Sequence, residues 1–257
     1  MKYIRFLSDG KETYGQLVDN SVFILEGTLE TGFHPTGKEI SFSGLALLPP
    51  VAPSKVVCVG LNYLDHIKEF NHEVPDSPVL FIKPSTSVIA PDATIIRPIQ
   101  SKRVDYEGEL AIVVGKRASN ISEKDAGNYI WGYTCGNDVT ARDLQPQDGQ
   151  WTIAKGFDTF APIGPWVVTG IDPEHLAIKT YLNGQVKQNS NTEYLLFKPH
   201  MLLSFVSSIM TLLPGDVIMT GTSSGVGPME NGDEVIVEIE KIGQLRNVVS
   251  TENASYE

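Results

Sequence analysis

The segment from Val104 to Gly115, VDYEGELAIVVG, places three acidic residues directly before an apolar run. Because side chains alternate between the two faces of a β-strand, Asp105, Glu107 and Glu109 are predicted to point to one face. Neighbours on that face lie roughly 7 Å apart, where two negative charges repel by about 2 kcal/mol at an effective dielectric of about 20. Either this face is exposed to solvent, or a divalent cation binds there and the carboxylates are its ligands.

A further acidic candidate is Asp138, in the segment GYTCGNDVTARDLQ. It directly follows an apolar, strand-like stretch, so its short carboxylate can point into a site at the end of a strand. Asp138 is also typical of a turn, since a glycine and an asparagine precede it. With Glu107 and Glu109 it supplies three oxygen ligands, which suits Mg²⁺ or Mn²⁺ with water and substrate completing the octahedron.

Acid–base chemistry is indicated by His66 and Glu69 in the segment NYLDHIKE. Three residues apart on a helix, they share a face and can hydrogen-bond or hold a common water. A carboxylate beside an imidazole orients the ring and raises its basicity, as a general base requires. The alternative is a surface helix in which the pair is incidental. Gly60 before and Pro75 after this segment favour a short helix that can order over a site as a lid.

Two further segments offer groups for an anionic substrate. Lys155 lies in an otherwise apolar run, WTIAKGFDTFAPIGP. It is either the lysine of an edge strand or a partner for the negative charge of the substrate. The loop MTGTSSGVG, residues 219–227, offers Thr222 and backbone N–H groups to a carboxylate or an oxyanion. It lacks the lysine and the spacing of nucleotide-binding loops, so no nucleotide site is predicted.

The composition is that of an ordinary globular protein, with 257 residues of which 41% are hydrophobic and 20% charged. A net charge of −11 argues against a nucleic-acid partner or an anionic membrane surface, because no basic stretch is left to neutralise phosphates. The polar N-terminus and the short apolar runs predict neither a signal peptide nor a membrane span. Cys58 and Cys135 fall in apolar runs, so we expect buried free thiols and a cytoplasmic protein.

The pattern of elements predicts an α+β fold that is predominantly β, a mixed β-sandwich or roll with a small N-terminal β subdomain. Runs rich in β-branched and aromatic residues recur along the chain with turn residues between them. Asn183-Gly184 and Asn231-Gly232 are typical of hairpin turns. Strands and helices do not alternate regularly, which makes a doubly wound parallel sheet a poor fit.

Capping and stop signals predict a few short helices, over 63–71, from Ser122 onward, and over 198–213. Several prolines fall between Leu47 and Lys55, a composition typical of an extended connector. We therefore divide the chain into a small N-terminal β subdomain and a main body, residues 1–50 and 51–257.

Seven segments, in order along the chain, resemble the fumarylacetoacetate hydrolase family: CVGLNYLDHIKE, PVLFIKPSTSVIAP, VDYEGELAIVVGK, GYTCGNDVTARDLQ, WTIAKGFDTFAPIGP, LNGQVKQNSNT and LLPGDVIMTGTSSGVGPMENGDEVIVEIEKIG. The similarity runs from about Lys55 to Ile242, and the small β-unit before it resembles the N-terminal piece of bacterial members. The resemblance implies that residues 51–257 form a catalytic domain, a β-rich roll around one Mg²⁺ or Mn²⁺ per subunit, in a homodimer.

The resemblance also implies roles for single residues. It implies metal ligands at Glu107, Glu109 and Asp138, and a water-activating lid pair at His66 and Glu69. Lys155, Gln145 and Thr222 match substrate-contacting positions of the family, and Lys155 also matches a catalytic one. Arg142 matches an arginine in the same segment as Asp138.

The reaction implied is hydrolysis of a C–C bond in an acylpyruvate-type diketo acid, such as acetylpyruvate or fumarylpyruvate. The metal would stabilise a pyruvate enolate as a Lewis acid while His66 and Glu69 activate water, and the products would be pyruvate and a carboxylic acid. Decarboxylation of oxaloacetate and isomerisation of 2-hydroxyhepta-2,4-diene-1,7-dioate are alternatives that share the enolate. A non-catalytic binder of small molecules on the same scaffold is disfavoured, because a binder needs no lid pair.

Overall fold

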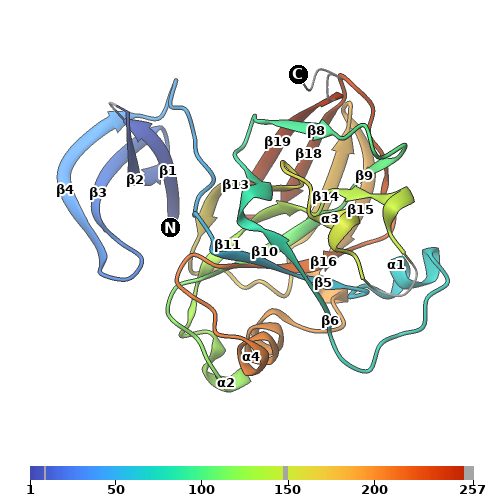
Figure 1. The fold of residues 1–257 in the computed structure, drawn as a ribbon. Helices are drawn as coiled ribbons and strands as arrows, with labels where there is room; N and C mark the ends of the chain where they lie inside the picture. The colour runs from blue at the N-terminus through green and yellow to red at the C-terminus, as the bar shows by residue number, and fades with distance from the viewer. Residues whose placement is uncertain (9, 147–149, 252–257) are drawn as a thin grey trace.

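The computed structural model describes residues 1–8, 10–146 and 150–251, so residues 252–257 of the predicted main body lie outside it. Its largest sheet has 11 strands and extends from the N-terminal strands through the centre of the molecule (Figure 1). Strand β7 (Val88–Ile89) pairs with one of the strands of this sheet, β13, and the other strands follow one another in space as β4 (Gly32–Ser41), β3 (Ser21–Thr28), β2 (Lys11–Val18), β1 (Lys2–Ser8), β13 (Ala161–Val168), β11 (Ile130–Asn137), β10 (Gly108–Val114), β16 (Val217–Thr222), β5 (Lys55–Gly60) and β6 (Val79–Pro84).

Two smaller sheets complete the main body, so the predicted β-rich α+β class is confirmed. One has the strand order β12 (Thr140–Ala141), β9 (Val104–Tyr106) and β17 (Gly227–Pro228). The other has the order β15 (Gln185–Asn191), β14 (Ala177–Leu182), β18 (Glu234–Ile239), β19 (Gly243–Thr251) and β8 (Thr94–Arg97). The helical elements are short: α1 (Leu64–Glu69), η1 (Ser85–Ser87), α2 (Glu123–Ala126), η2 (Arg142–Leu144), α3 (Thr152–Lys155), η3 (Thr192–Tyr194) and α4 (Pro199–Ile209).

The N-terminal strands β1–β4 form an antiparallel meander with a small core of its own. That core is an apolar cluster of Ile4, Phe6, Leu17 and Val22. The meander continues the large sheet because β1 pairs with β13 at its first residues, where Lys2 and Tyr3 lie opposite Val168 and Val167. Figure 1 shows this unit beside the main body, away from the short helices.

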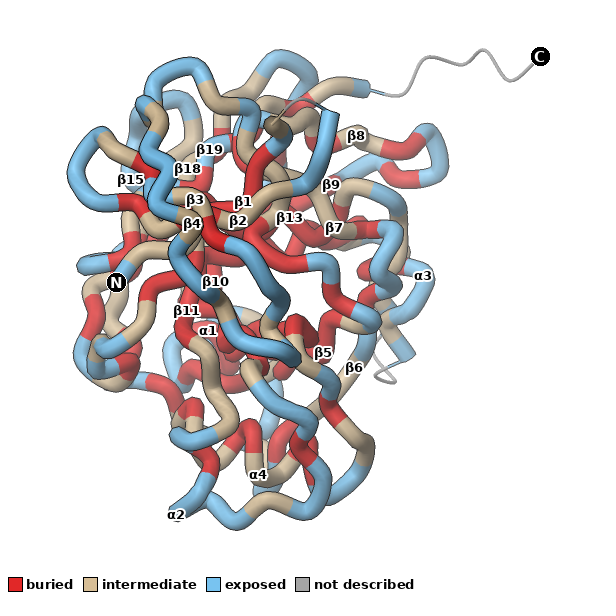
Figure 2. The backbone as a smooth tube through the Cα atoms, turned by 90° about the vertical axis from the view of Figure 1, so that its left-hand side faces the viewer, coloured by how far each residue is buried: buried red, intermediate tan, exposed pale blue. Residues whose placement is uncertain are grey.

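The centre of the main body is strand β10, which is buried along its whole length. Figure 2 shows the buried segments gathered in the interior of the molecule and the exposed ones mainly in its outer turns. Its alternate residues enter two different apolar clusters, since Leu110, Ile112 and Val114 pack on one side of the sheet and Ala111 and Val113 on the other. A strand covered on both faces carries an unbroken apolar run, as the sequence does here. Glu107 and Glu109 therefore lie at the start of a strand that is packed on both faces.

The two predicted hairpin turns have different outcomes. Asn183-Gly184 joins β14 to β15 as a two-residue turn, with positive φ at both positions, as predicted. The hairpin at Asn231-Gly232 is a wrong prediction, because β17 before it pairs with β9 while β18 after it pairs with β14 and β19. Gly232 does turn the chain with φ +89°, but the turn leads into another sheet.

Each predicted helix is present, although two are shorter than expected. Helix α2 follows Ser122, whose side chain accepts a hydrogen bond from the N–H of Asp125. Helix α1 covers only the centre of the predicted 63–71. Helix α4 has Pro199 in its first turn as predicted, but it ends at Ile209 because residue 212 enters a β-bridge with residue 118. Within the described residues, no helix is both long and apolar enough to cross a membrane.

Candidate active site

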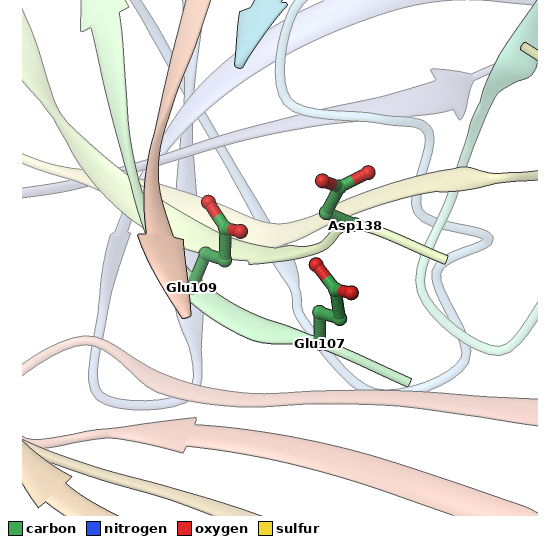
Figure 3. Close-up of side chains that lie close together, drawn as sticks. All are labelled: Glu107, Glu109 and Asp138. Atoms are coloured by element: carbon green, nitrogen blue, oxygen red, sulfur yellow. The ribbon is translucent and has the colours of Figure 1, made fainter. Parts of the chain in front are cut away.

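The three predicted ligands lie together at the ends of two central strands (Figure 3). Glu107 directly precedes β10, Glu109 lies in it, and Asp138 directly follows the neighbouring strand β11. The antiparallel pairing places Asp138 beside Glu107, whose carbonyl accepts the N–H of Asp138 at 2.9 Å. All three side chains are buried, and one carboxylate oxygen from each lies within 4.8 Å of the others.

The prediction that Asp105 shares this face is wrong. The chain leaves the regular strand at Glu107, so β9 with Asp105 belongs to the three-stranded sheet rather than to that of β10. The two oxygens of Asp105 instead accept hydrogen bonds, each 2.9 Å long, from the Nε atoms of Arg103 and Arg142. Asp105 therefore holds Arg142, whose Nη2 reaches Glu107.

Buried lysines surround the acidic group. Lys155, at the end of α3, donates from Nζ to Glu107 Oε2 at 2.9 Å and to Asp138 Oδ2 at 2.6 Å. Lys83, which was not predicted from the sequence, is fully buried in β6 and donates to the other oxygen of Asp138 and to the carbonyl of Val139. Its sequence signal is its position in VLFIKP, where strand alternation places it opposite the exposed Ile82.

The carboxylates of this group differ in their electrostatic surroundings. Burial alone would raise the pKa of Glu107, but Lys155 and Arg142 outweigh it and hold that pKa well below its ordinary value. Burial, and then the negative charges of Asp138 and Glu107, raise the pKa of Glu109 well above its ordinary value. Burial would lower the pKa of Lys155, but Asp138 and Glu107 raise it. Glu107 and Lys155 are therefore charged, whereas the surroundings of Glu109 make the ionisation of its carboxyl group unfavourable.

Glu107, Glu109 and Asp138 fit a divalent cation on two grounds. Their donor atoms are hard carboxylate oxygens, which Mg²⁺, Mn²⁺ and Ca²⁺ prefer. Glu109 Oε2 accepts only the N–H of Gly221, at 2.6 Å, and no cationic side chain among the described residues pairs with this carboxylate. A bound cation would remove the repulsion that burdens Glu109, so this triad could hold one.

The predicted lid pair lies on α1, which faces the acidic group. His66 is buried, and its Nδ1 lies 3.2 Å from Glu69 Oε2. Because a carboxylate only accepts, Nδ1 carries the proton in the neutral ring and Nε2 keeps a free lone pair. Burial lowers the pKa of His66, although Glu107 and Glu69 partly offset this effect.

Helix α1 is fastened to the glycine-rich loop that follows β16. The N–H of Gly225 donates to the Glu69 carboxylate at 3.1 Å and 3.3 Å. The hydroxyl of Ser224 donates to Asp65 Oδ2 at 2.8 Å, and the other Asp65 oxygen accepts the N–H of His66. The loop thus holds α1 through the carboxylates of Asp65 and Glu69, and the same two side chains bond the backbone and the ring of His66.

One pocket brings together all the predicted site residues except Glu69, which lies behind His66. Its lining contains His66, Glu107, Glu109, Asp138, Arg142, Gln145, Lys155 and Thr222. The hydroxyl of Thr222 donates to the carbonyl of Gly108 at 3.0 Å, so its only hydrogen is already used. The pocket also has an aromatic lining that was not predicted from the sequence, formed by Phe70, Phe81 and Trp151.

Comparison with known proteins defines the family. Residues 55–250 match the family described as "Fumarylacetoacetate (FAA) hydrolase C-terminal", and residues 1–50 match the one described as "Rv2993c-like, N-terminal". The chain therefore belongs to the fumarylacetoacetate hydrolase family and is an enzyme of that family, as the resemblance predicted.

Relatives with a named activity are not all hydrolases. The mitochondrial oxaloacetate tautomerase Fahd2a of Rattus norvegicus is 45% identical over 79% of this chain and 68% of its own length. The structure is also similar to that of 5-carboxymethyl-2-hydroxymuconate delta-isomerase from Mycobacterium smegmatis, with 41% identity, TM-score 0.92 and 98% and 100% of the two chains covered. For 2-hydroxyhepta-2,4-diene-1,7-dioate isomerase from Mycobacterium marinum, the identity is 41%, the TM-score 0.90 and the coverage 98% and 99%.

Proposed function

We propose that this enzyme catalyses keto–enol tautomerisation of an oxaloacetate-like 2-oxo acid, at a site that holds one Mg²⁺ or Mn²⁺ ion per subunit. The observation that carries the proposal is that His66, with a free lone pair on Nε2, lines the same pocket as the acidic triad. The named relatives support it, because a tautomerase and an isomerase rearrange a substrate without losing atoms.

In this proposal Glu107, Glu109 and Asp138 would hold the cation, whose chemistry when bound is to polarise an oxygen ligand as a Lewis acid. Lys155 lines the pocket and has three N–H donors, of which two are used by the triad. Its third donor is available to a substrate carboxylate. The predicted contacts of Arg142, Gln145 and Thr222 with the substrate stay predictions.

The proton transfer is assigned to the lid. His66 Nε2 accepts a proton from the carbon next to the keto group and returns it to the oxygen, so the substrate is rearranged and the ring is regenerated. Glu69 stabilises the intermediate imidazolium and keeps Nδ1 protonated. The lowered pKa of His66 keeps the ring neutral, and therefore basic, at neutral pH.

Hydrolysis of an acylpyruvate is the second candidate, favoured by the same His66–Glu69 pair. Here Nε2 would deprotonate a water whose oxygen attacks the distal carbonyl, the bond from that carbonyl carbon to C3 would break, and C3 would take up the proton. Both candidates need the triad and the base. They differ in whether a water fits between the base and the substrate.

A substrate panel distinguishes the candidates. Oxaloacetate, acetylpyruvate and fumarylpyruvate are tested with Mg²⁺, with Mn²⁺ and with EDTA, following enol absorbance, pyruvate and CO₂. We expect a metal-dependent acceleration of oxaloacetate enol loss without release of pyruvate. Pyruvate from the diketo acids would favour hydrolysis, CO₂ from oxaloacetate would favour decarboxylation, and no turnover of any substrate would contradict both candidates.

The homodimer and the cytoplasmic location expected from the sequence stay predictions. Light scattering on the purified protein measures the mass in solution, for which we expect twice that of the 28.1 kDa chain.

A further inference from the structure

Strand β15 contains one buried residue, Gln188, among neighbours that face solvent. Its side chain is 2% exposed and makes hydrogen bonds through both ends of the amide. Nε2 donates to Thr222 Oγ1 and to the carbonyl of Ser223, each at 2.8 Å. Oε1 accepts the N–H of Gly108 at 3.0 Å. One side-chain amide from the five-stranded sheet thus joins β10, at Gly108, to the end of β16 and the loop that follows it.

Gly108 is the residue between the two glutamates of the triad. Its N–H is held by Gln188, and its carbonyl is held by the Thr222 hydroxyl that Gln188 in turn orients. The peptide groups on both sides of Gly108 are therefore fixed by side chains. The rotation of these groups sets the directions in which Glu107 and Glu109 leave the backbone.

The regular ladder fixes this segment on one side only. Between β10 and β16 the register shifts, so that Glu109 lies opposite Thr222 while Ala111 lies opposite Met219. On the other side the pairing with β11 is regular, with Gly108 opposite Asn137 and Glu109 opposite Gly136. Where a ladder is interrupted, side-chain hydrogen bonds decide the backbone geometry.

Close packing adds a second constraint at Gly108. A Cβ atom there would lie 2.1 Å from Thr180 Oγ1 and 3.3 Å from Gln188 Oε1. The backbone therefore approaches β14 and the Gln188 amide so closely that only glycine fits.

We propose that Gln188 is a positioning residue of the metal site, acting through Gly108 on Glu107 and Glu109 and through Thr222 on the pocket wall. The inference rests on the proposed metal binding. Outer-shell partners that orient ligands typically change metal affinity about 10- to 100-fold when they are removed. Gln188 has the burial, the satisfied amide and the direct connection to the ligand strand that such a role requires.

The test is Mn²⁺ titration of the full chain, by calorimetry and by the electron paramagnetic resonance (EPR) spectrum of the bound ion, for wild type and Gln188→Met. Methionine keeps the length of the side chain but forms none of the three hydrogen bonds. The matched control is Asn247→Leu, since Asn247 is also a buried amide that donates two backbone hydrogen bonds, to Ala90 and Ala93. Urea unfolding in EDTA measures the stability of each variant.

We expect Gln188→Met to lower the Mn²⁺ affinity about 10- to 100-fold and to alter the EPR spectrum, while Asn247→Leu loses stability but keeps both. Unchanged affinity and spectrum in a folded Gln188→Met protein would overturn the proposal. If Gln188→Met does not fold, Gln188→Glu replaces it. That variant keeps an acceptor for Gly108 but loses both donors, and a wild-type spectrum would again overturn the proposal. Failure of wild type to bind Mn²⁺ would instead overturn the proposed metal site itself.

Discussion

The two walls of the pocket are built in different ways. The wall with Glu107, Glu109 and Asp138 stands on strands buried on both faces, and all three carboxylates are buried. The opposite wall is α1, a helix of six residues with no side-chain hydrogen bond at its N-cap, attached through Asp65 and Glu69. A rigid sheet suits groups that would hold an ion in fixed geometry, whereas a short helix attached by two side chains suits a group that would move when substrate enters.

This difference separates two kinds of effect. Changes in the sheet wall should alter metal affinity, and changes in the helix wall should alter rate while the ion still binds. Each variant below is therefore measured for both quantities, and a variant that moves the wrong quantity would break the comparison.

The largest effect on metal affinity is expected for Glu109→Gln. The variant keeps the shape of the side chain but loses a charged ligand, so Mn²⁺ affinity should fall by more than about 100-fold, beyond the range for outer-shell partners. Because Glu109 is buried among negative charges, the same variant should be more stable than wild type in EDTA at pH 7, by about 1 kcal/mol or more. Calorimetry and urea unfolding measure the two effects, and retained affinity would contradict the assignment.

The stability gain of Glu109→Gln should depend on pH. The folded-state pKa of Glu109 is raised above its ordinary value of 4.5, so its contribution to stability is present below that value and is lost as pH rises through the folded pKa. In EDTA the wild type should therefore lose stability relative to Glu109→Gln as pH increases from 5 to 8. If the stability difference between the two proteins does not vary with pH, the folded-state pKa of Glu109 is not raised.

For His66→Ala we expect kcat to fall about 100- to 10,000-fold, since the general base is lost. Mn²⁺ affinity should stay within about threefold, because the ligands stand on the other wall. The control is His175→Ala, at an exposed position outside the pocket, which should leave both quantities unchanged. If hydrolysis, decarboxylation and tautomerisation all survive in His66→Ala, the assignment of the base is wrong.

A smaller effect is expected for Glu69→Gln, in the pH profile of kcat/KM. Burial lowers the pKa of His66 from its ordinary value of 6.5, and the neutral ring is the active form. Activity should therefore persist below pH 6.5 and be lost only as pH falls through the lowered pKa. Glu69 raises that pKa, so Glu69→Gln should move the acid limb to still lower pH and reduce kcat about tenfold. An acid limb that moves to higher pH in Glu69→Gln would contradict this prediction.

The smallest effect is expected for Ser224→Ala, which removes one hydrogen bond between the loop and the lid. Losing the bond from Ser224 to Asp65 should weaken the attachment of α1 to the loop by about 0.5–1.5 kcal/mol, which corresponds to a roughly two- to tenfold rise in KM. Ser208→Ala serves as the control, because it removes an exposed hydroxyl on α4 that donates only within its own helix, to the carbonyl of Phe205. Equal KM values in the two variants would show that Ser224 does not fasten the lid.

The sheet wall could largely be predicted from the sequence, because the pattern that indicates it lies within one short segment. Glu107 and Glu109 precede an apolar run with the spacing of one strand face, and the burial of that run follows from its composition. The break at Glu107 could not be predicted, since it depends on which sheets the two halves join. Asp105 was therefore placed with the triad although it pairs with Arg103 and Arg142.

The supporting residues escaped prediction because their partners are distant in the chain. Lys83 is separated from Asp138 by 55 positions, and Gln188 from Gly108 by 80. Strand alternation indicates which face such a residue occupies, but it does not say which element covers that face. The same reason explains the hairpin wrongly expected at Asn231-Gly232, where the turn chemistry is correct and the strand partner is different.

The most direct measurement is anomalous X-ray diffraction from crystals of this enzyme soaked with Mn²⁺. We expect one strong anomalous peak per subunit, with an oxygen of Glu107, of Glu109 and of Asp138 each within about 2.0–2.3 Å of it. A peak at other residues, or an empty triad with Lys83 and Lys155 still bound to Asp138 at saturating Mn²⁺, would contradict this expectation.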